Sequence, residues 1–422
     1  MGISESIKRI KSGFLPSFWV ANIMELFERI AYYGQTAILS IFLRDHLKFS
    51  EIDTGRLASI FNGLIYFLPI FAGALADKFG FRKAFSFAFL ILAMGYFMIG
   101  ATGMAAFSSL FPHDNLFLIL SIILIFTAIG GSFIKPSVLG TVALTSSPET
   151  KSVGYALYYT LVNIGGAVGP FIAYLVHRHI GIQFVYVVSS VSCALMLVST
   201  LIFYKEPPSA KEGNVSLGVV VKNLFLVLKN FRFIIFLLIF SLYWLMYWQV
   251  YIIIPFYVKD FISKDAPFEI ITSVGAWSII FLQLFVNWFT KKLPPITAII
   301  TGFAVAAICW LIIMLSPTVP VMIAGLVIFA IGEMTQAPRY YEYIADLAPK
   351  GQAALFQGYA FLPIAIGWAF GGTLGGWLYT SFAKGISKSP QTIFLILFGI
   401  GVLAAVLMFI YNLVIKSRPK AA

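Results

Sequence analysis

The stretch GALADKFGFRK, residues 73–83, is a short polar loop between two apolar stretches at 54–75 and 84–103. Its glycines permit a tight turn, and Asp77 can pair with a basic residue or face a helix N-terminus. Apolar stretches of this kind recur along all 422 residues, and each is long enough for a transmembrane helix of about 20 residues. Twelve are expected, at 16–43, 54–75, 84–103, 115–143, 153–176, 182–204, 232–258, 270–290, 296–316, 319–345, 353–383 and 391–415.

The composition agrees with a membrane protein. Hydrophobic residues make up 60% of the chain and charged residues only 11%, whereas a soluble domain carries about 25% charged residues. Lipid must therefore solvate most of the surface. This excludes a soluble enzyme, a disordered interaction protein and a disulfide scaffold.

The net charge of +12 is best interpreted as a topology signal. When the loops are assigned to alternate sides, eighteen Lys and Arg residues fall on one side and eight on the other. By the positive-inside rule, both termini are expected in the cytoplasm. The basic excess then requires no nucleic-acid partner.

Signs of enzyme chemistry are missing from the sequence. Cys193 and Cys309 both fall inside apolar stretches, so neither a disulfide nor a metal site is expected. Phosphate-loop, metalloprotease and nucleophile-elbow patterns are absent. We predict no enzyme activity and no cofactor, no cleavable signal at the N-terminus, and no role for the glycosylation sequon at Asn214.

An internal repeat divides the chain. A polar interruption at 205–222 separates two halves, and an offset of 202 residues maps Gly130 and Pro136 onto Gly332 and Pro338. The sequence predicts an N-terminal six-helix bundle at 1–204, a cytoplasmic linker at 205–231 and a C-terminal six-helix bundle at 232–422. Transporters built from such repeats bind substrate near the membrane midplane.

Seven charged residues are expected inside the membrane, where each costs at least about 2.5–3.5 kcal/mol. Four of them are Glu, and such a cost is rarely tolerated without a use. The seven are Glu25, Glu28, Arg29, Lys135, Glu333, Arg339 and Glu342.

The first expected helix carries a polar stripe. At about 100° per residue, Glu25, Glu28, Arg29 and Tyr32 fall within one 100° arc, which must face protein or water. Lys135 lies at a similar depth in the fourth helix, so a cluster is feasible. With three positive and four negative charges, one carboxylate lacks a basic partner, as proton coupling requires. The alternative is a static buried network that joins two helices.

These motifs resemble two related families. Residues 73–83 resemble the G-x-L-A-D-x-x-G-x-[RK]-[RK] signature of the major facilitator superfamily. The stretch ELFERIAYYG at 25–34 is similar to the E-x-x-E-R-F-x-Y-Y-G motif of the proton-dependent oligopeptide transporters, with Ile30 in place of Phe. Further matches to that family are GSFIKP at 131–136, YTLVNIG at 159–165, Trp244 with Gln249, GEMTQAP at 332–338 and LAP at 347–349.

The resemblance implies roles for individual residues. Arg29 and Lys135 would face a peptide carboxylate, and Glu333 would face its amino group. Glu25 and Glu28 would couple to the proton by exchanging partners with Arg29 and Lys135. Tyr32, Tyr66, Asn163 and Trp244 would line the site, although packing or interface anchoring is an equal alternative for Tyr32, Tyr66 and Trp244.

Several positions depart from the family pattern. Ala360 stands where the family has an eleventh-helix Trp, and Tyr247 and Trp248 replace acidic residues. Arg339 and Glu342 are spaced to pair on one helix face, but Arg339 could also bind an extra negative charge on the substrate.

Together these features predict an all-α major facilitator fold with twelve transmembrane helices in two pseudo-symmetric bundles. The expected function is proton-coupled import of small zwitterions, foremost di- and tripeptides, by alternating access. Alternatives are proton-coupled transport of another organic anion or amino-acid conjugate, and a non-transporting ligand sensor. The expected setting is a prokaryotic inner membrane, with the protein a monomer whose partners are substrate, protons and lipid.

Overall fold

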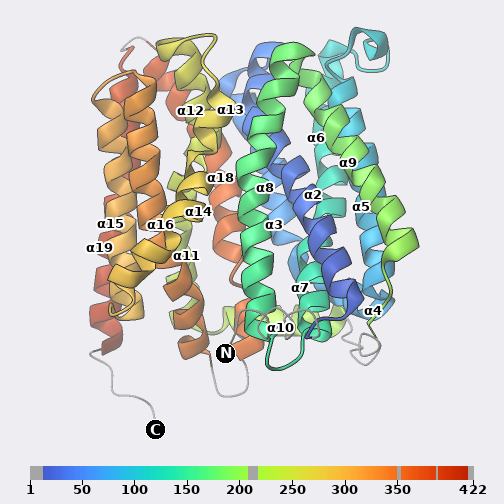
Figure 1. Ribbon diagram of the computed structural model, residues 1–422. Helices are drawn as coiled ribbons and strands as arrows, with labels where there is room; N and C mark the ends of the chain where they lie inside the picture. The colour runs from blue at the N-terminus through green and yellow to red at the C-terminus, as the bar shows by residue number, and fades with distance from the viewer. Residues whose placement is uncertain (1–12, 208–216, 349–352, 386–387, 417–422) are drawn as a thin grey trace. The chain divides into compact units, whose positions relative to one another are not determined.

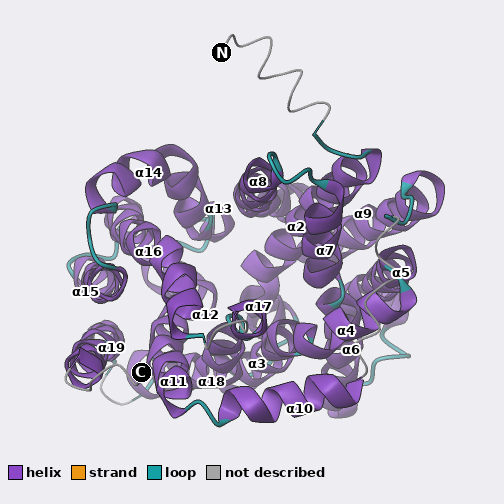
Figure 2. Ribbon diagram, turned by 90° about the horizontal axis from the view of Figure 1, so that it is seen from below, coloured by secondary structure: helices purple, strands orange, loops and turns teal. Residues whose placement is uncertain are grey.

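The computed structural model describes residues 13–207, 217–348, 353–385 and 388–416. Within these ranges all named elements are helices (Figures 1 and 2), and one isolated β-bridge joins Phe14 to Ser146. The predicted all-α class is therefore confirmed. In chain order the elements are α2 (Pro16–Ile41), η1 (Phe42–His46), α3 (Glu51–Phe67), α4 (Pro69–Phe79), α5 (Phe81–Ala101), η2 (Ala105–Phe107), η3 (His113–Asn115), α6 (Leu116–Ser132), α7 (Ile134–Thr145), α8 (Lys151–His179), α9 (Ile182–Phe203), α10 (Leu217–Leu228), α11 (Phe231–Tyr247), α12 (Gln249–Tyr257), η5 (Val258–Ile262), α13 (Phe268–Thr272), α14 (Val274–Thr290), α15 (Pro295–Met314), α16 (Val319–Leu347), α17 (Ala353–Gly358), α18 (Leu362–Leu378), η6 (Tyr379–Ala383) and α19 (Pro390–Lys416).

The number of spans differs from the predicted twelve. Among the described residues, ten helices are long and apolar enough to cross a membrane, or eleven if the bent pair α3 and α4 is one span. The remaining predicted stretch, 16–43, does form the 26-residue helix α2. It falls outside the ten or eleven because Glu25, Glu28 and Arg29 lower its apolarity. The chain is a multi-pass membrane protein.

Prolines break several of the predicted spans. A proline ring clashes with the carbonyl four residues earlier, so a helix tends to end just before it. Pro69 follows the end of α3, where the chain bends by 45°. Pro136 lies in the first turn of α7, after α6 has ended at Ser132. Pro363 likewise lies in the first turn of α18.

By their contacts the described residues form two compact units. One combines residues up to Ile38 with Leu64–Val221, and the other combines Leu39–Gly63 with residues from Lys222 onward. Residues 39–63 thus group with the second unit, although they precede the predicted linker. The bundle boundaries at 204 and 232 remain a prediction.

Each unit is held by close helix packing. In the first, α5 packs against α6 and α9, and α4 packs against α7. In the second, α15 packs against α16 and α19, and α18 packs against α11. Both views show α15 beside α16 and α19 (Figures 1 and 2).

The predicted linker contains a helix that the sequence analysis missed. Residues Leu217–Leu228 form α10, in a segment that we expected to be a loop. Its apolar residues were taken as part of a polar interruption because of the neighbouring lysines and prolines. The sequon at Asn214 and Pro349 of the LAP motif lie outside the described residues. So do seven of the eighteen basic residues on which the predicted orientation rests, namely Lys8, Arg9, Lys11, Lys211, Lys350, Arg418 and Lys420.

Candidate functional site

The polar stripe of α2 is buried and forms an ion-pair cluster. Arg29 Nε lies 2.6 Å from Glu28 Oε2 and 3.4 Å from Glu25 Oε1. Both carboxylates are fully buried, and Arg29 is 2% exposed. One guanidinium therefore serves two carboxylates, as the sequence pattern predicted.

Glycines of α8 seal one flank of this stripe. A Cβ atom at Gly165 would lie 2.4 Å from Arg29 Cβ, and one at Gly169 would lie 2.5 Å from the Ile30 carbonyl oxygen. Side chains larger than hydrogen at these two positions would push α8 off α2. The close contact keeps lipid and water away from that flank of the charges.

Lys135 is brought near the cluster by two helix breaks. Tyr66 lies just before the break between α3 and α4, and Lys135 lies just after the break between α6 and α7. Lys135 Nζ is 4.7 Å from the centre of the Tyr66 ring, a cation–π distance. The side chain of Tyr66 is also hydrogen-bonded to that of Tyr32.

These side chains surround a small cavity in the first unit. Its volume is about 10 Å³, which is the space that one water molecule needs. Two cations and two phenols therefore converge on one polar space. The lining residues are Arg29, Tyr32, Ile65, Tyr66, Pro69, Gly131 and Lys135.

The carboxylates are less well satisfied than the cations. Both side-chain oxygens of Glu25 and Oε1 of Glu28 are buried without a hydrogen bond in the described part of the chain. A buried carboxylate oxygen left without a donor is costly as an anion. This arrangement suits groups that gain and lose a proton.

Asn163, also predicted to line the site, is half-buried on α8. Its side-chain amide donates to the Tyr159 carbonyl oxygen of the same helix at 2.9 Å. Asn163 is not among the residues that line the cavity. Its predicted role therefore stays a prediction.

In the second unit, Glu333 and Trp244 lie on different helices. Glu333 is half-buried on α16, and within the described ranges it has no hydrogen bond or ion pair. Trp244 on α11 stacks on Trp248, with ring centres 5.4 Å apart. Because no partner for Glu333 is found among the described residues, its carboxylate is available to a ligand cation.

The Arg339 side chain is hydrogen-bonded to two nearby groups of the protein. Its guanidinium donates to Glu342 Oε2 at 2.5 Å and to the carbonyl oxygen of Lys291, at the end of α14, at 2.6 Å. The i, i+3 pairing expected from the sequence is confirmed. Binding of an extra substrate charge at Arg339 would require these bonds to break.

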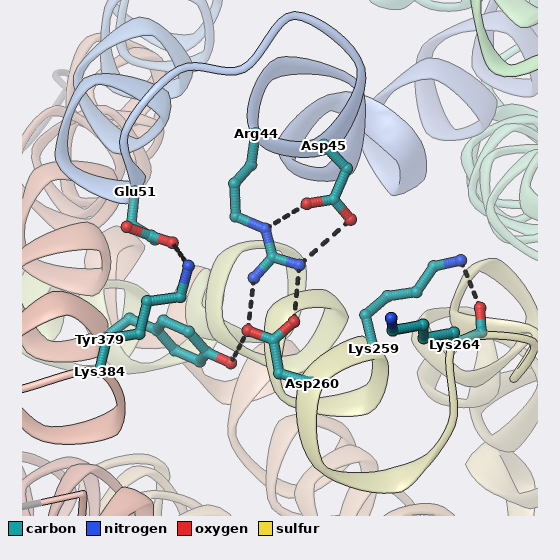
Figure 3. A network of polar contacts seen from close by, with 8 residues as sticks. All are labelled: Arg44, Asp45, Glu51, Lys259, Asp260, Lys264, Tyr379 and Lys384. Carbon is teal, nitrogen blue, oxygen red and sulfur yellow. Dashed lines mark hydrogen bonds and ion pairs between the residues drawn. The ribbon is translucent and has the colours of Figure 1, made fainter.

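The second unit contains a polar network that was not expected from the sequence, which we call the clasp: Arg44, Asp45, Asp260 and Tyr379 (Figure 3). Arg44 donates to Asp260 through two nitrogens, at 2.8 and 3.0 Å, and to Asp45 at 2.6 Å. Tyr379 donates to Asp260 at 2.7 Å. Glu51 and Lys384 form a further ion pair beside it.

The clasp is built from three π-helical turns, η1, η5 and η6, which supply Arg44, Asp260 and Tyr379 respectively. Such turns occur frequently at functional sites. The first expected helix stops at residue 43, which would place Arg44 in the following loop, but Arg44 is only 8% exposed. Because Asp260 follows it by 216 residues, no local pattern could have revealed the pair.

Comparison with known proteins agrees with this fold. Residues 22–263 and 262–422 match the family model of the Major Facilitator Superfamily. The chain belongs to the Major Facilitator Superfamily. The match includes residues 73–83, which resemble the signature of this superfamily.

Within this superfamily the chain is similar to peptide permeases. It is 29% identical over 199 residues to dipeptide and tripeptide permease B of Aliivibrio fischeri (strain MJ11), covering 46% of this chain and 37% of the permease. It is 30% identical over 152 residues to dipeptide and tripeptide permease A of Escherichia coli (strain K12), covering 35% and 28% respectively. The similarity thus spans about a third of the length of these relatives.

Solved structures of transporters share the fold of this chain over nearly its whole length. A POT family transporter in complex with 5-aminolevulinic acid has a TM-score of 0.75 at 18% identity, covering 95% of this chain and 96% of its own. A nucleoside transporter mutant has a TM-score of 0.77 at 16% identity, covering 94% and 99%. At these identities the likeness establishes the fold alone.

Proposed function

We propose that this major facilitator is a proton-coupled symporter of the oligopeptide transporter family. It imports small zwitterions by alternating access, and di- and tripeptides are the first substrate class to test. The observation that carries the proposal is the convergence of Arg29 and Lys135 with Tyr32 and Tyr66 around one small cavity of the first unit. Two cations and two phenols form a suitable site for a carboxylate.

The buried carboxylates would provide the proton coupling. Glu25 and Glu28 share Arg29 while three of their four oxygens lack a hydrogen bond in the described structure. A substrate carboxylate that binds Arg29 and Lys135 would withdraw positive charge from Glu25 and Glu28. Protonation would then become favourable, and substrate and proton would bind together.

Glu333 would bind the amino group of the substrate. Its carboxylate lies in the second unit and has no protein cation among its described contacts. Cations for the substrate carboxylate and Glu333 for its ammonium group would favour a zwitterion over a dianion or a dication. Trp244 and Asn163 would add contacts to the bound peptide.

A different organic anion was the main alternative, and Arg339 was its principal support. The bonds of Arg339 to Glu342 and to the end of α14 weaken that support. Zwitterions other than peptides would fit the same charges. A transporter with this fold has been solved in complex with 5-aminolevulinic acid. Amino-acid-like zwitterions therefore belong in the substrate panel.

The proposed setting is a prokaryotic inner membrane, with both termini in the cytoplasm and the protein acting as a monomer. The charge bias of the loops supports the orientation. The partners are then the substrate, protons and the surrounding lipid.

The test is uptake of labelled dialanine into proteoliposomes with and without an inward proton gradient. We expect gradient-driven uptake by the wild type, and at least about tenfold less in Glu333→Gln, because the substrate ammonium loses its counter-charge. The matched control is Glu342→Gln, the same change on the same helix, at a half-exposed side chain already paired with Arg339. It should transport like the wild type. Absence of wild-type uptake by folded protein would contradict the peptide assignment.

A further inference from the structure

Three tryptophans form a continuous stack between α11 and α18. Trp244 stacks on Trp248, and Trp248 stacks on Trp368 with ring centres 4.3 Å apart and planes inclined by 22°. Trp248 is 4% exposed and Trp368 is 1% exposed. The two inner rings therefore leave no room between them, and the stack extends inward from Trp244, a residue of the proposed substrate site.

The position of this stack follows from the glycines of α18. Gly367 meets Trp244 so closely that a Cβ atom there would lie 2.6 Å from Trp244 Cβ, and Gly372 meets Gly55 of α3 in the same manner. At 100° per residue, Trp368 lies between these two glycine faces. Its indole therefore points between the faces of α18 that meet α11 and α3, inside the second unit, and stacks on Trp248.

One feature distinguishes the stack from an ordinary core. The chain breaks at Trp248, where a tight turn bonds the Tyr251 amide to the Trp248 carbonyl, and mid-helix turns of this type often mark functional positions.

We propose that Trp248 and Trp368 form an indole plug that limits the size of the substrate side chain accepted next to Trp244. The proposal rests on the proposed peptide transport and narrows it. The favoured substrates are zwitterions with small side chains, such as glycyl and alanyl dipeptides. Large aromatic side chains are excluded, because the two rings occupy the volume that they would need.

The test compares binding of dialanine and diphenylalanine to purified protein by thermal stabilisation, together with inhibition of labelled dialanine uptake. The wild type should prefer dialanine. In Trp248→Ala and Trp368→Ala, the ratio of the two affinities should shift toward diphenylalanine by about tenfold or more, as expected when a hydrophobic pocket gains space. If an alanine variant fails to fold, Trp248→Leu and Trp368→Leu remove the rings and keep part of the volume, and the shift should have the same sign.

Trp310→Ala is the matched control. Trp310 is fully buried in the same unit, on α15, where it stacks on Phe394 and packs edge-on against Phe329. The control should leave the ratio within about twofold of the wild type, a change well below the tenfold effect of an altered pocket.

The outcomes separate the two claims. Dialanine transport with an unchanged ratio in both plug variants would overturn the plug and leave the proposed function standing. Equal wild-type affinity for both peptides would also overturn the plug. A wild type that binds and transports neither peptide would overturn the proposed function and the plug with it.

Discussion

Arg29 connects the two tasks that the proposed cycle requires. Its guanidinium contacts Glu25 and Glu28, and the same side chain lines the cavity next to Lys135. A buried ion pair of this kind adds little to stability, because desolvation offsets much of the attraction. Its retention in an apolar helix is better explained by exchange of partners than by structural support.

Tyr66 offers a test of the cavity at the scale of one side chain. Its ring faces the Lys135 ammonium, and its side chain is hydrogen-bonded to Tyr32. Tyr66→Phe keeps the ring and removes the hydroxyl, whereas Tyr66→Leu removes both. We measure the inhibition constant of unlabelled dialanine against uptake of labelled dialanine. It should be about 2- to 30-fold higher in the Leu variant than in the Phe variant, which is the range of a cation–π contribution of about 0.5–2 kcal/mol. Equal inhibition constants would show that the ring does not position Lys135.

At the scale of elements, interruptions in the helices position the side chains of the proposed site. Tyr66, Lys135 and Trp248 each lie within two residues of a break, because an interrupted helix can turn a side chain toward a cavity. Glycines then let helices approach closely: α8 reaches α2 at Gly165 and Gly169, and α18 reaches α3 at Gly372. The helix breaks and the close helix contacts together determine which faces of these helices can line a cavity.

The contact between α8 and α2 can be tested by adding one methyl group. In Gly169→Ala the new Cβ would lie 2.5 Å from the Ile30 carbonyl oxygen, so two backbones must separate. We expect a cost of about 1–3 kcal/mol and a thermal midpoint in detergent lower by a few degrees.

Gly399→Ala on α19 is the control for this change, because a Cβ atom there meets nothing within 4 Å. It should leave the midpoint unchanged or raise it slightly, since alanine is the better helix former by about 1 kcal/mol. A Gly169→Ala protein as stable as Gly399→Ala would refute the close packing.

At the scale of the whole molecule, the sequence predicted the helices better than their long-range contacts. All twelve predicted stretches are helical, and the stripe of Glu25, Glu28 and Arg29 was correctly grouped, because a single helix has a fixed period. The clasp of Arg44 and Asp260 was not predictable, since its residues are 216 positions apart. The stack of Trp248 on Trp368 was missed for the same reason, as was α10, whose apolar run lies among lysines and prolines.

The most direct test of proton coupling compares gradient-driven uptake of dialanine with its counterflow, an exchange that requires no net proton movement. Both activities are measured in Glu25→Gln and Glu28→Gln, with Glu342→Gln as the control. We expect at least one α2 variant to lose gradient-driven uptake by about tenfold or more. Counterflow should persist in that variant, because glutamine imitates the protonated acid. Full gradient-driven uptake in both α2 variants would show that neither carboxylate couples transport to the proton.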